Sequence, residues 1–336
     1  MQTFIGIMPF TLINFEYSFD LMLEKNVFLF CGGDKKEVRE IINLIPNTFY
    51  TQEFISNLKQ EDSAYLTVLT EIMDFEADKE DEHQANFTQS VHSTYYNLSM
   101  CLWLIKDCSI SNQELLGFFK SQEDTSKKSI RQNIKDVKHS DSKGVYSVVK
   151  FSKEEIQKSL KYWDKLDLEL LKQKEKKNNS TEYLGKTHVP SNNISFSEFS
   201  RIGKALLFVI EARKTTFLPS KIASYSSGFE ALISTSKEQI TVNIAERIAN
   251  LLGNSLEEKK EIFKKVKDIY SARSNYIHGT DYSERKNKKL ESLSQEADNL
   301  LRKLIVLFLE NDKFYSLRWK NDTELDQWYR ENYIFN

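Results

Sequence analysis

One short string in the last quarter of the chain combines side chains that bind phosphate and move protons. It covers residues 270–279 and reads YSARSNYIHG. Arg273 and His278 are separated by four residues, and no other arginine of the chain is followed by histidine at this spacing. A guanidinium can bind a phosphate through two parallel hydrogen bonds, and an imidazole can accept or donate a proton near neutral pH. The pair is therefore the first candidate for a chemical site.

A helix is expected to position this string. Ser255 can cap its N-terminus, and apolar residues recur at helical spacing as far as Ile277. Arg273 lies on the same stripe as these apolar residues, where a charge is costly without a partner or a ligand. In a continuous helix His278 would lie about 140° around from Arg273. Gly279 can end the helix at that point and let the histidine leave its axis.

Asn275 and His278 are three residues apart, so they can share a helix face. The string thus predicts Arg, Asn and His around one helix end. A second interpretation needs no chemistry. Cationic side chains near a helix C-terminus oppose the macrodipole, an effect of about 0.3–1 kcal/mol each.

Further helical segments surround the string. Their apolar residues recur at helical spacing, Pro219 suits a first turn, and Gly253 suits the C′ position of a helix end. The expected helices are Ser197–Lys214, Pro219–Ile233, Ile240–Leu252 and Lys289–Leu309. The short connections predict an antiparallel helical bundle. The C-terminal aromatic residues Trp319, Trp328 and Tyr333 are expected to pack back on it.

Three strings of this half resemble, in order, those of the HEPN superfamily, specifically its Apea-type domain. The R-x4-H string followed by Gly279 is the family's signature. Phe229–Leu232 (FEAL) resembles its helix-two string, and Ala245–Gly253 (AERIANLLG) resembles its R-x-A-x-L-L-G string. The resemblance covers about residues 196–310 and does not extend to residues 1–190.

The resemblance implies a helical bundle that dimerises and brings two R-x4-H motifs into one cleft. Many members are metal-independent ribonucleases of phage defence, toxin–antitoxin or RNA-processing systems. Carried over, Arg273 and His278 are the catalytic pair, and Asn275 and Ser274 are supporting residues. Thr280 stands where toxin-type members often carry a tyrosine, so regulation through that tyrosine is not expected.

Glu230 and Arg247 also match family strings. They are supporting candidates, and a structural contact between helices is the alternative role for both.

The expected reaction fits these residue types. RNA carries its own nucleophile, the 2′-OH. The imidazole can take its proton or protonate the leaving 5′ oxygen, and the guanidinium stabilises charge in the transition state. The expected products carry 2′,3′-cyclic phosphate and 5′-OH ends, and DNA is not a substrate. No metal and no cofactor is expected.

Composition bounds the fold. The 336 residues suggest two domains; 40% are apolar, and only 10 are glycine and 4 proline. Few turn residues favour helices and exclude an all-β sandwich. We expect a mainly α chain: an α-rich α+β N-terminal domain (1–190) of unrecognised family, and a HEPN-type antiparallel helical bundle (191–336).

The first half shows fewer clear signals. Thr3–Ile7 and Val27–Cys31 are expected strands, Lys35–Ile45 and Phe87–Lys106 expected helices, and His92 a packing residue. Residues 71–82 contain seven acidic residues and one lysine. A solvated loop or helix face is the simpler interpretation of this segment, and a metal-binding or inhibitory acidic loop is the alternative.

Residues 120–195 form the expected connector, basic and largely helical. A strand is expected at Val145–Phe151. A helix should follow from Lys153 toward Lys177, capped by Ser152 with Glu155 in the capping-box position. A linker is expected from about Lys174 to Ser195.

Charge is unevenly distributed. The net charge is −11 over residues 1–119, +6 over 120–186 and +3 over 187–336, which gives −2 in total. An acidic surface repels RNA. We therefore expect residues 1–119 to sense a trigger or a partner, such as an antitoxin or a phage component, and to restrain the nuclease. The alternative is that this half completes the fold by burying Leu98, Leu102 and Trp103 against the bundle.

Three widely spaced cysteines predict neither a disulfide framework nor a zinc site. The sequence has no apolar run of about 18 residues and no signal-peptide pattern, so we expect a cytoplasmic protein without a membrane partner. Two other functions remain open. One is a non-catalytic HEPN dimer that binds RNA, nucleotide or a protein. The other, a DNA-binding or structural helical protein, is disfavoured by near-neutral charge.

Overall fold

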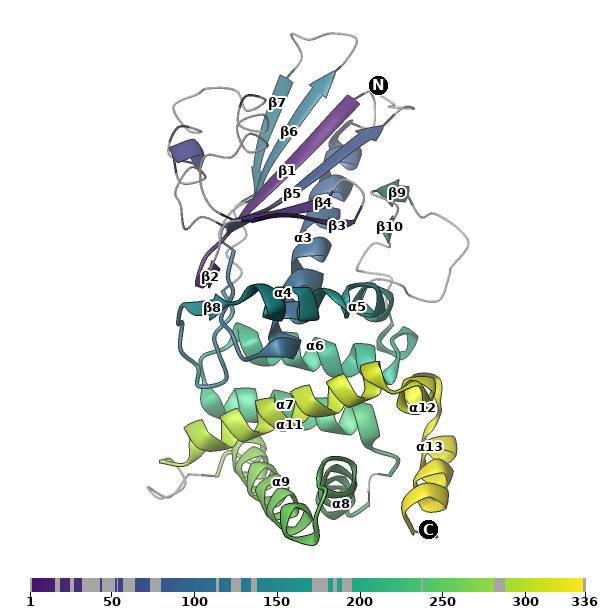
Figure 1. Ribbon diagram of the computed structural model, residues 1–336. Helices are drawn as coiled ribbons and strands as arrows, with labels where there is room; N and C mark the ends of the chain where they lie inside the picture. Colours follow the sequence, from purple (N-terminus) through teal and green to yellow (C-terminus); the bar gives the residue numbers. More distant parts are fainter. Residues whose placement is uncertain are drawn as a thin grey trace.

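The computed structural model describes most of the chain. The described residues are 2–15, 19–24, 27–31, 43, 52, 54–56, 64–72, 80–112, 115–121, 128–133, 138–170, 181–183, 186–188, 195–236, 238–280 and 288–334. The chain is mainly helical, with an antiparallel sheet near one end and layers of helices near the other (Figure 1).

The sheet has six strands in the order β3-β4-β5-β1-β6-β7, and every neighbouring pair is antiparallel. The strands are β1 (Gln2–Phe10), β3 (Phe19–Glu24), β4 (Val27–Cys31), β5 (Ala64–Ile72), β6 (Leu115–Ser121) and β7 (Lys128–Asn133). Two short pairs lie outside it: β2 (Ile13–Phe15) with β8 (Val149–Phe151), and β9 (Thr181–Tyr183) with β10 (Lys186–His188).

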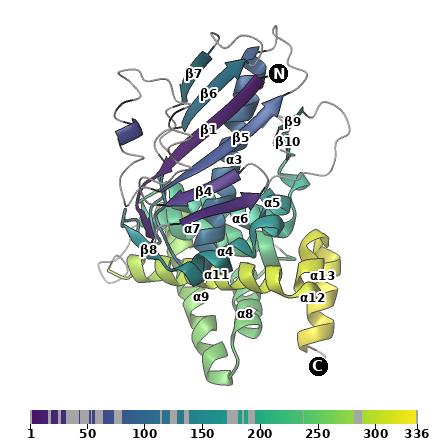
Figure 2. The same ribbon diagram turned by 45° about the horizontal axis from the view of Figure 1, so that its top comes forward.

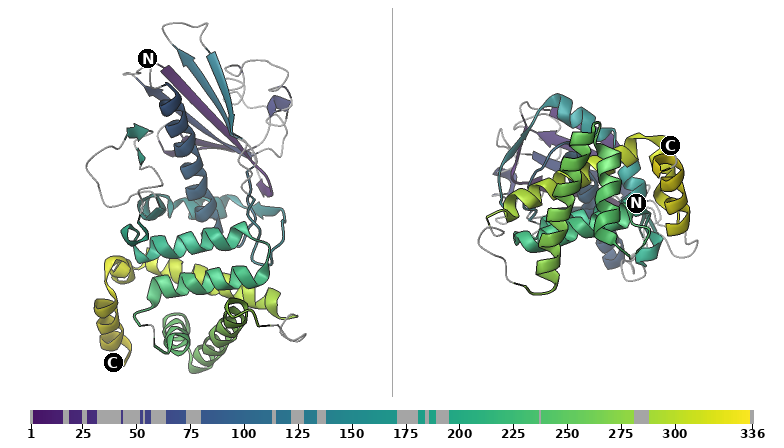
Figure 3. Two further views of the ribbon diagram at one scale, coloured as in Figure 1. Left: turned by 180° about the vertical axis from the view of Figure 1, so that it is seen from behind. Right: turned by 90° about the horizontal axis from the view of Figure 1, so that it is seen from below.

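The long helix α3 (Glu80–Ile105) covers one face of the sheet. Seen from behind, it runs along the strands and continues into the helical part (Figure 3, left). It approaches β1 closely at Gly6, where a Cβ atom would lie 2.9 Å from Val91 Cγ2. A glycine at this position therefore permits the contact between helix and sheet.

The helical part is built in layers below the sheet. Its elements are α4 (Lys153–Leu160), α5 (Trp163–Leu170), α6 (Arg201–Lys214), α7 (Leu218–Ile233), α8 (Ile240–Leu252), α9 (Leu256–Ile277) and α11 (Leu290–Glu310). Helix α7 packs on α6, α9 and α11. Helices α8 and α9 lie side by side at the end farthest from the sheet (Figure 2).

The C-terminal segment returns along the side of the layers. It comprises α12 (Asp312–Tyr315), the 3₁₀ turn η4 (Ser316–Trp319), α13 (Asp322–Tyr329) and the π-helical turn η5 (Arg330–Ile334). Trp328 packs against the core and Trp319 is exposed. The expected return of the C-terminal stretch on the bundle is thus confirmed, although the Trp319 side chain itself is exposed. Tyr333 contacts Trp328 at a centroid distance of 5.7 Å.

Helix α3 contributes its C-terminal half to the core of the helical layers. Trp103 is fully buried, and its Nε1 donates to Asp298 Oδ1 of α11 at 2.8 Å. Burial raises the pKa of Asp298 to about 6, although Arg302 lies 3.1 Å away. Arg213 of α6 is also buried and donates to the carbonyl oxygen of Cys108 at 2.8 Å. These contacts cross from the expected N-terminal unit into the expected bundle.

The first third contains more strand than the sequence suggested. The expected strands at residues 3–7 and 27–31 lie in β1 and β4, but β3, β5, β6 and β7 were missed. Strand β7 falls in the segment expected to be a helical connector. It lies at the sheet edge, where charged residues are tolerated. The sheet joins strands from the acidic and basic segments, so the charge division does not mark separate units.

The predicted helices and the acidic segment of the first 106 residues differ in how far the structure describes them. The helix at residues 87–106 is confirmed within α3, and His92 is buried there. The predicted helix at residues 35–45 lies outside the described residues, apart from Asn43. Residues 71–72 end β5 and 80–82 begin α3, where acidic side chains favourably oppose the helix dipole. The rest of that acidic segment lies outside the described residues.

The connector also differs from its prediction. The capping box of Ser152 and Glu155 is present, but the helix is interrupted at Lys161 and Tyr162 and resumes as α5 as far as Leu170; residues 171–177 lie outside the described residues. Tertiary contacts explain the break, because Tyr162 is buried and its hydroxyl donates to Glu310 Oε1 at 2.6 Å. The expected strand is shortened to β8, and the expected linker contains β9 and β10.

The helices of the second half agree closely with the sequence. α8 has the predicted bounds, α7 has a proline in its first turn, and α9 is capped by Ser255. α6 begins at Arg201, behind Ser200, which accepts from the Gly203 N–H at 2.9 Å. Helix α8 ends directly before Gly253, as predicted, although the glycine is the C-cap residue rather than C′, with a φ of −89°.

We predict that Trp103→Ala destabilises the whole chain. The change removes a fully buried indole and the hydrogen bond to Asp298, a loss of about 3–5 kcal/mol. Trp319→Ala is the matched control, because that indole is exposed and its loss should cost within about 0.5 kcal/mol. Urea unfolding followed by circular dichroism measures both. Equal stability of the two variants would contradict the shared core.

Candidate functional site

Helix α9 carries the arginine and histidine of the string to its C-terminal end. Ser255 accepts a hydrogen bond from the Glu258 N–H at 3.2 Å and starts the helix. One stripe of the helix is buried and holds it against α7 and α8; the buried residues are Val266, Ile269, Tyr270 and Ala272. Arg273 is the next residue and lies at the margin of that stripe.

The helix ends in a Schellman motif that depends on Gly279. The Gly279 N–H donates to the Tyr276 carbonyl at 3.2 Å, and the Thr280 N–H donates to the Asn275 carbonyl at 2.9 Å. Gly279 has φ +63°, a left-handed conformation that favours glycine. His278 is the C-cap residue and is exposed. The glycine thus ends the helix directly after the histidine, as the sequence predicted.

Arg273 is held by a carboxylate from α7. Its Nη2 lies 3.3 Å from Glu230 Oε1, and the two side chains are 29% and 23% exposed. The guanidinium carbon also lies 5.8 Å from the centre of the Tyr270 ring. Burial, together with the nearby Glu230, raises the pKa of Tyr270 well above its usual range, so this ring stays neutral beside the ion pair.

The ion pair joins two of the strings found in the sequence. Glu230 belongs to residues 229–232 and Arg273 to residues 270–279. The charge predicted to need a partner on the apolar stripe therefore has one. The Arg273 side chain remains partly exposed, at 29%.

Ser274 and Asn275 contribute through their main chains. The Ser274 carbonyl accepts from the His278 N–H at 3.0 Å, and the Asn275 carbonyl accepts from Thr280. Ser274 is exposed and Asn275 half-buried. Both residues thus help to form the helix end that presents His278.

Arg247 lies apart from this group and fastens α8 to the C-terminal segment. Its Nη1 donates to the Ile233 carbonyl at 2.7 Å, and its Nη2 donates to Thr235 Oγ1 at 2.7 Å and Asp326 Oδ1 at 2.8 Å. The guanidinium carbon also lies 4.5 Å from the centre of the Tyr329 ring. These contacts favour the alternative role for Arg247, a structural contact between helices.

A cavity of about 570 Å³ lies between α8, the turn that precedes it and α13. Its lining includes residues of α8 and α13, and α9 lies on the opposite side of α8 from α13 (Figure 3, right). Its charged lining residues are Glu238, Glu246, Asp322, Asp326, Arg247 and Arg330. The acidic excess disfavours a phosphate. This cavity is therefore poorly suited to RNA.

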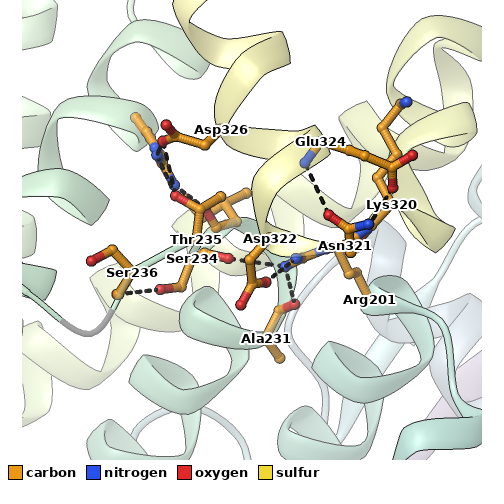
Figure 4. Close-up of polar contacts among 12 residues, drawn as sticks. Arg201, Ala231, Ser234, Thr235, Ser236, Lys320, Asn321, Asp322, Glu324 and Asp326 are labelled. Carbon is orange, nitrogen blue, oxygen red and sulfur yellow. Dashed lines mark hydrogen bonds and ion pairs between the residues drawn. The ribbon is translucent and has the colours of Figure 1, made fainter.

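Figure 4 shows polar contacts that involve four residues of the cavity lining, Thr235, Ser236, Asp322 and Asp326. Arg201 pairs with Asp322 and donates to the carbonyls of Ser234 and Lys320. The hydrogen bond from Arg330, with a further one from Thr235, holds the pKa of Asp326 below its usual value. These contacts commit Asp322 and Asp326 to arginines within the fold.

Sequence reasoning missed one exposed feature beside the string. The rings of Phe217, at the start of α7, and Tyr276 of α9 meet edge to face with centroids 5.8 Å apart. Tyr276 lay inside the string that we singled out, but its partner is 59 positions earlier in the chain. Nothing in the local sequence around Phe217 indicates this contact.

The described part of the chain contains no group of three or more His, Cys, Asp or Glu residues placed to hold a metal ion. None of its helices is both long and apolar enough to cross a membrane. Cys101 and Cys108 are buried and form no disulfide within the described residues, and burial raises the pKa of Cys108.

Comparisons with models of protein families, with curated proteins and with solved structures found no match for this chain.

We predict that Arg247→Ala destabilises the fold, because it removes three hydrogen bonds and the contact with Tyr329. The expected loss is roughly 2–4 kcal/mol in the free energy of unfolding. Arg330→Ala is the matched control, since this exposed arginine contacts the same Asp326, and a surface pair contributes about 0–1 kcal/mol. Chemical denaturation compares the two variants. An Arg247 variant as stable as the Arg330 variant would contradict the structural role.

Proposed function

We propose that this chain is a metal-independent endoribonuclease of HEPN type that acts as an antiphage-defence or toxin effector. One observation carries the proposal: Arg273 and Glu230, from two strings of the resemblance, form an ion pair at 3.3 Å, next to the helix end that exposes His278. The two side chains that could act on RNA are both accessible. The interpretation of Arg273 and His278 as mere helix-dipole partners does not account for the resemblance of the surrounding strings.

The proposed reaction uses the nucleophile that RNA carries. The imidazole of His278 takes the proton of a 2′-OH, and the 2′ oxygen forms a bond to phosphorus. The bond between phosphorus and the 5′ oxygen then breaks, and a protonated imidazole supplies the proton to that oxygen. Arg273 binds the non-bridging oxygens and stabilises the charge that develops there. The products carry 2′,3′-cyclic phosphate and 5′-OH ends.

Glu230 is a positioning residue in this proposal. Its carboxylate contacts the guanidinium and not the substrate, so it orients Arg273 from the α7 side. Ser274 and Asn275 act through the helix end, as described above. Arg247 has no part in the reaction.

The proposal includes a regulatory role for residues 1–119. Their net charge of −11 repels RNA, so this part fits a protein trigger, an antitoxin or another partner better than the substrate. Helix α3 runs from the sheet into the core of the helical layers. A partner bound to the sheet could therefore act on the helices through α3.

We predict that Arg273→Ala and His278→Ala each reduce RNA cleavage by about 10²–10³-fold or more, because each removes one reacting group. Cleavage of labelled RNA is measured in EDTA, with matched circular dichroism spectra. Arg330→Ala is the control, as an exposed arginine outside the proposed site, and should cleave at the wild-type rate. Undiminished cleavage by either of the first two variants would overturn the catalytic assignment.

A second prediction concerns assembly. One chain holds a single R-x4-H string, whereas the reaction needs a proton acceptor and a proton donor, so we propose a two-fold homodimer through the C-terminal helices. Light scattering at micromolar concentration should give about twice the chain mass of 39.4 kDa. A particle of single-chain mass with full activity would refute the dimer.

A further inference from the structure

Three large apolar side chains are exposed at or beside the C-terminal end of α9. Phe217, Tyr276 and Ile277 are 57%, 37% and 58% exposed. Phe217 precedes α7 and makes no side-chain cap for it, and its ring meets Tyr276 edge to face. We call these three residues the aromatic patch. Exposed large apolar side chains that cluster in this way commonly mark a binding surface.

The patch adjoins the residues proposed to act on RNA. Tyr276 is three positions after Arg273, so the two side chains share a helix face. Tyr276 is also two positions before His278, whose main chain ends the same helix. Arg273, Tyr276 and His278 therefore all lie within the last two turns of one helix and its cap.

The size of the patch favours a small occupant. A large side chain offers about 200 Å², so the exposed fractions leave roughly 300 Å² of apolar surface. A stable interface between two proteins buries about 800 Å² on each partner. The patch alone is too small for that, whereas one or two nucleobases cover an area of this order.

The residue types also favour bases. Flat aromatic rings stack with nucleobases, and single-stranded RNA is recognised largely in this way. An edge-to-face pair presents one ring face and one ring edge, a geometry suited to a base that stacks on one side. Ile277, the next residue after Tyr276, adds further exposed apolar surface at the same helix end.

We propose that Phe217 and Tyr276 form a stacking platform for one or two bases next to the cleaved phosphate of single-stranded RNA. The inference rests on the proposed function, because it takes RNA as the ligand. In this proposal the patch positions the RNA strand, so that Arg273 and His278 contact the same phosphate. The platform is sequence-tolerant, since every base offers a flat face.

The test measures the binding of a fluorescent single-stranded RNA of twelve nucleotides by anisotropy. All variants carry His278→Ala in the full chain to prevent cleavage. Phe217→Leu with Tyr276→Leu keeps the apolar character but removes the rings. This change should weaken binding at least about 5-fold. Phe217→Tyr with Tyr276→Phe should retain the affinity.

Phe196→Leu is the matched control. Phe196 is also an exposed aromatic residue in an edge-to-face pair, with Phe208 at 5.9 Å, but it precedes α6 and lies outside the string. Its replacement should leave the affinity unchanged. An equal loss for this control would show a general surface effect and overturn the platform.

Other outcomes are also decisive. The inference is overturned if the double leucine variant binds RNA as tightly as its parent, the chain that carries only His278→Ala. It is also overturned if that parent does not bind RNA. It is also overturned if light scattering shows that the leucine changes split a dimer, because the patch is then a contact between copies. RNA that binds through the rings but is not cut by the wild-type protein would refute the ribonuclease and leave the platform standing.

Discussion

Two buried charges set the conditions for the rest of the structure. Arg213 and Asp298 lie in the interior of the helical layers, where an unpaired charge is very costly. Each is stabilised by groups from residues 99–108: Arg213 by the Cys108 carbonyl and Ser99, and Asp298 by the indole of Trp103. The helical layers therefore need the end of α3 to satisfy their own interior. A division of the chain at residue 190 would remove these partners.

The position of the proposed site follows from this arrangement. Helix α7 packs against α6 and α11, the helices that carry Arg213 and Asp298, and α9 packs against α7. Glu230 on the accessible side of α7 then meets Arg273 of α9. The ion pair thus joins two helices that pack on those of the buried charges, and its own side chains remain partly exposed. A packed interior with a partly exposed ion pair above it suits the proposed site, which must keep its geometry and still admit a polymer.

How much of this could be predicted depended on how local each signal was. The bounds of α8, the cap at Ser255 and the capping box at Ser152 follow from neighbouring residues, so the sequence was enough. The helix end at Gly279 was predictable for the same reason. Strand pairing is not local, and β7 carries basic residues that are typical of solvated segments, so most of the sheet was missed.

The same limit holds for the candidate site. A charge on an apolar stripe indicated that Arg273 has a partner, and the resemblance indicated Glu230 as a site candidate. The partner of Arg247, however, is Asp326, 79 positions later, and its local string gave no sign of it. The contact between Phe217 and Tyr276 could not be predicted from the sequence either, because only the packing of α7 on α9 brings the two residues together.

The proposed ribonuclease activity is tested most directly by the chemical groups at the ends of the cleaved RNA. The full-length protein is incubated in EDTA with a single-stranded RNA and with DNA of the same sequence, and the product ends are identified by mass spectrometry. The account predicts RNA fragments with 2′,3′-cyclic phosphate and 5′-OH ends and intact DNA. Fragments with 5′-phosphate ends, or cleavage that appears only when a divalent cation is added, would contradict it.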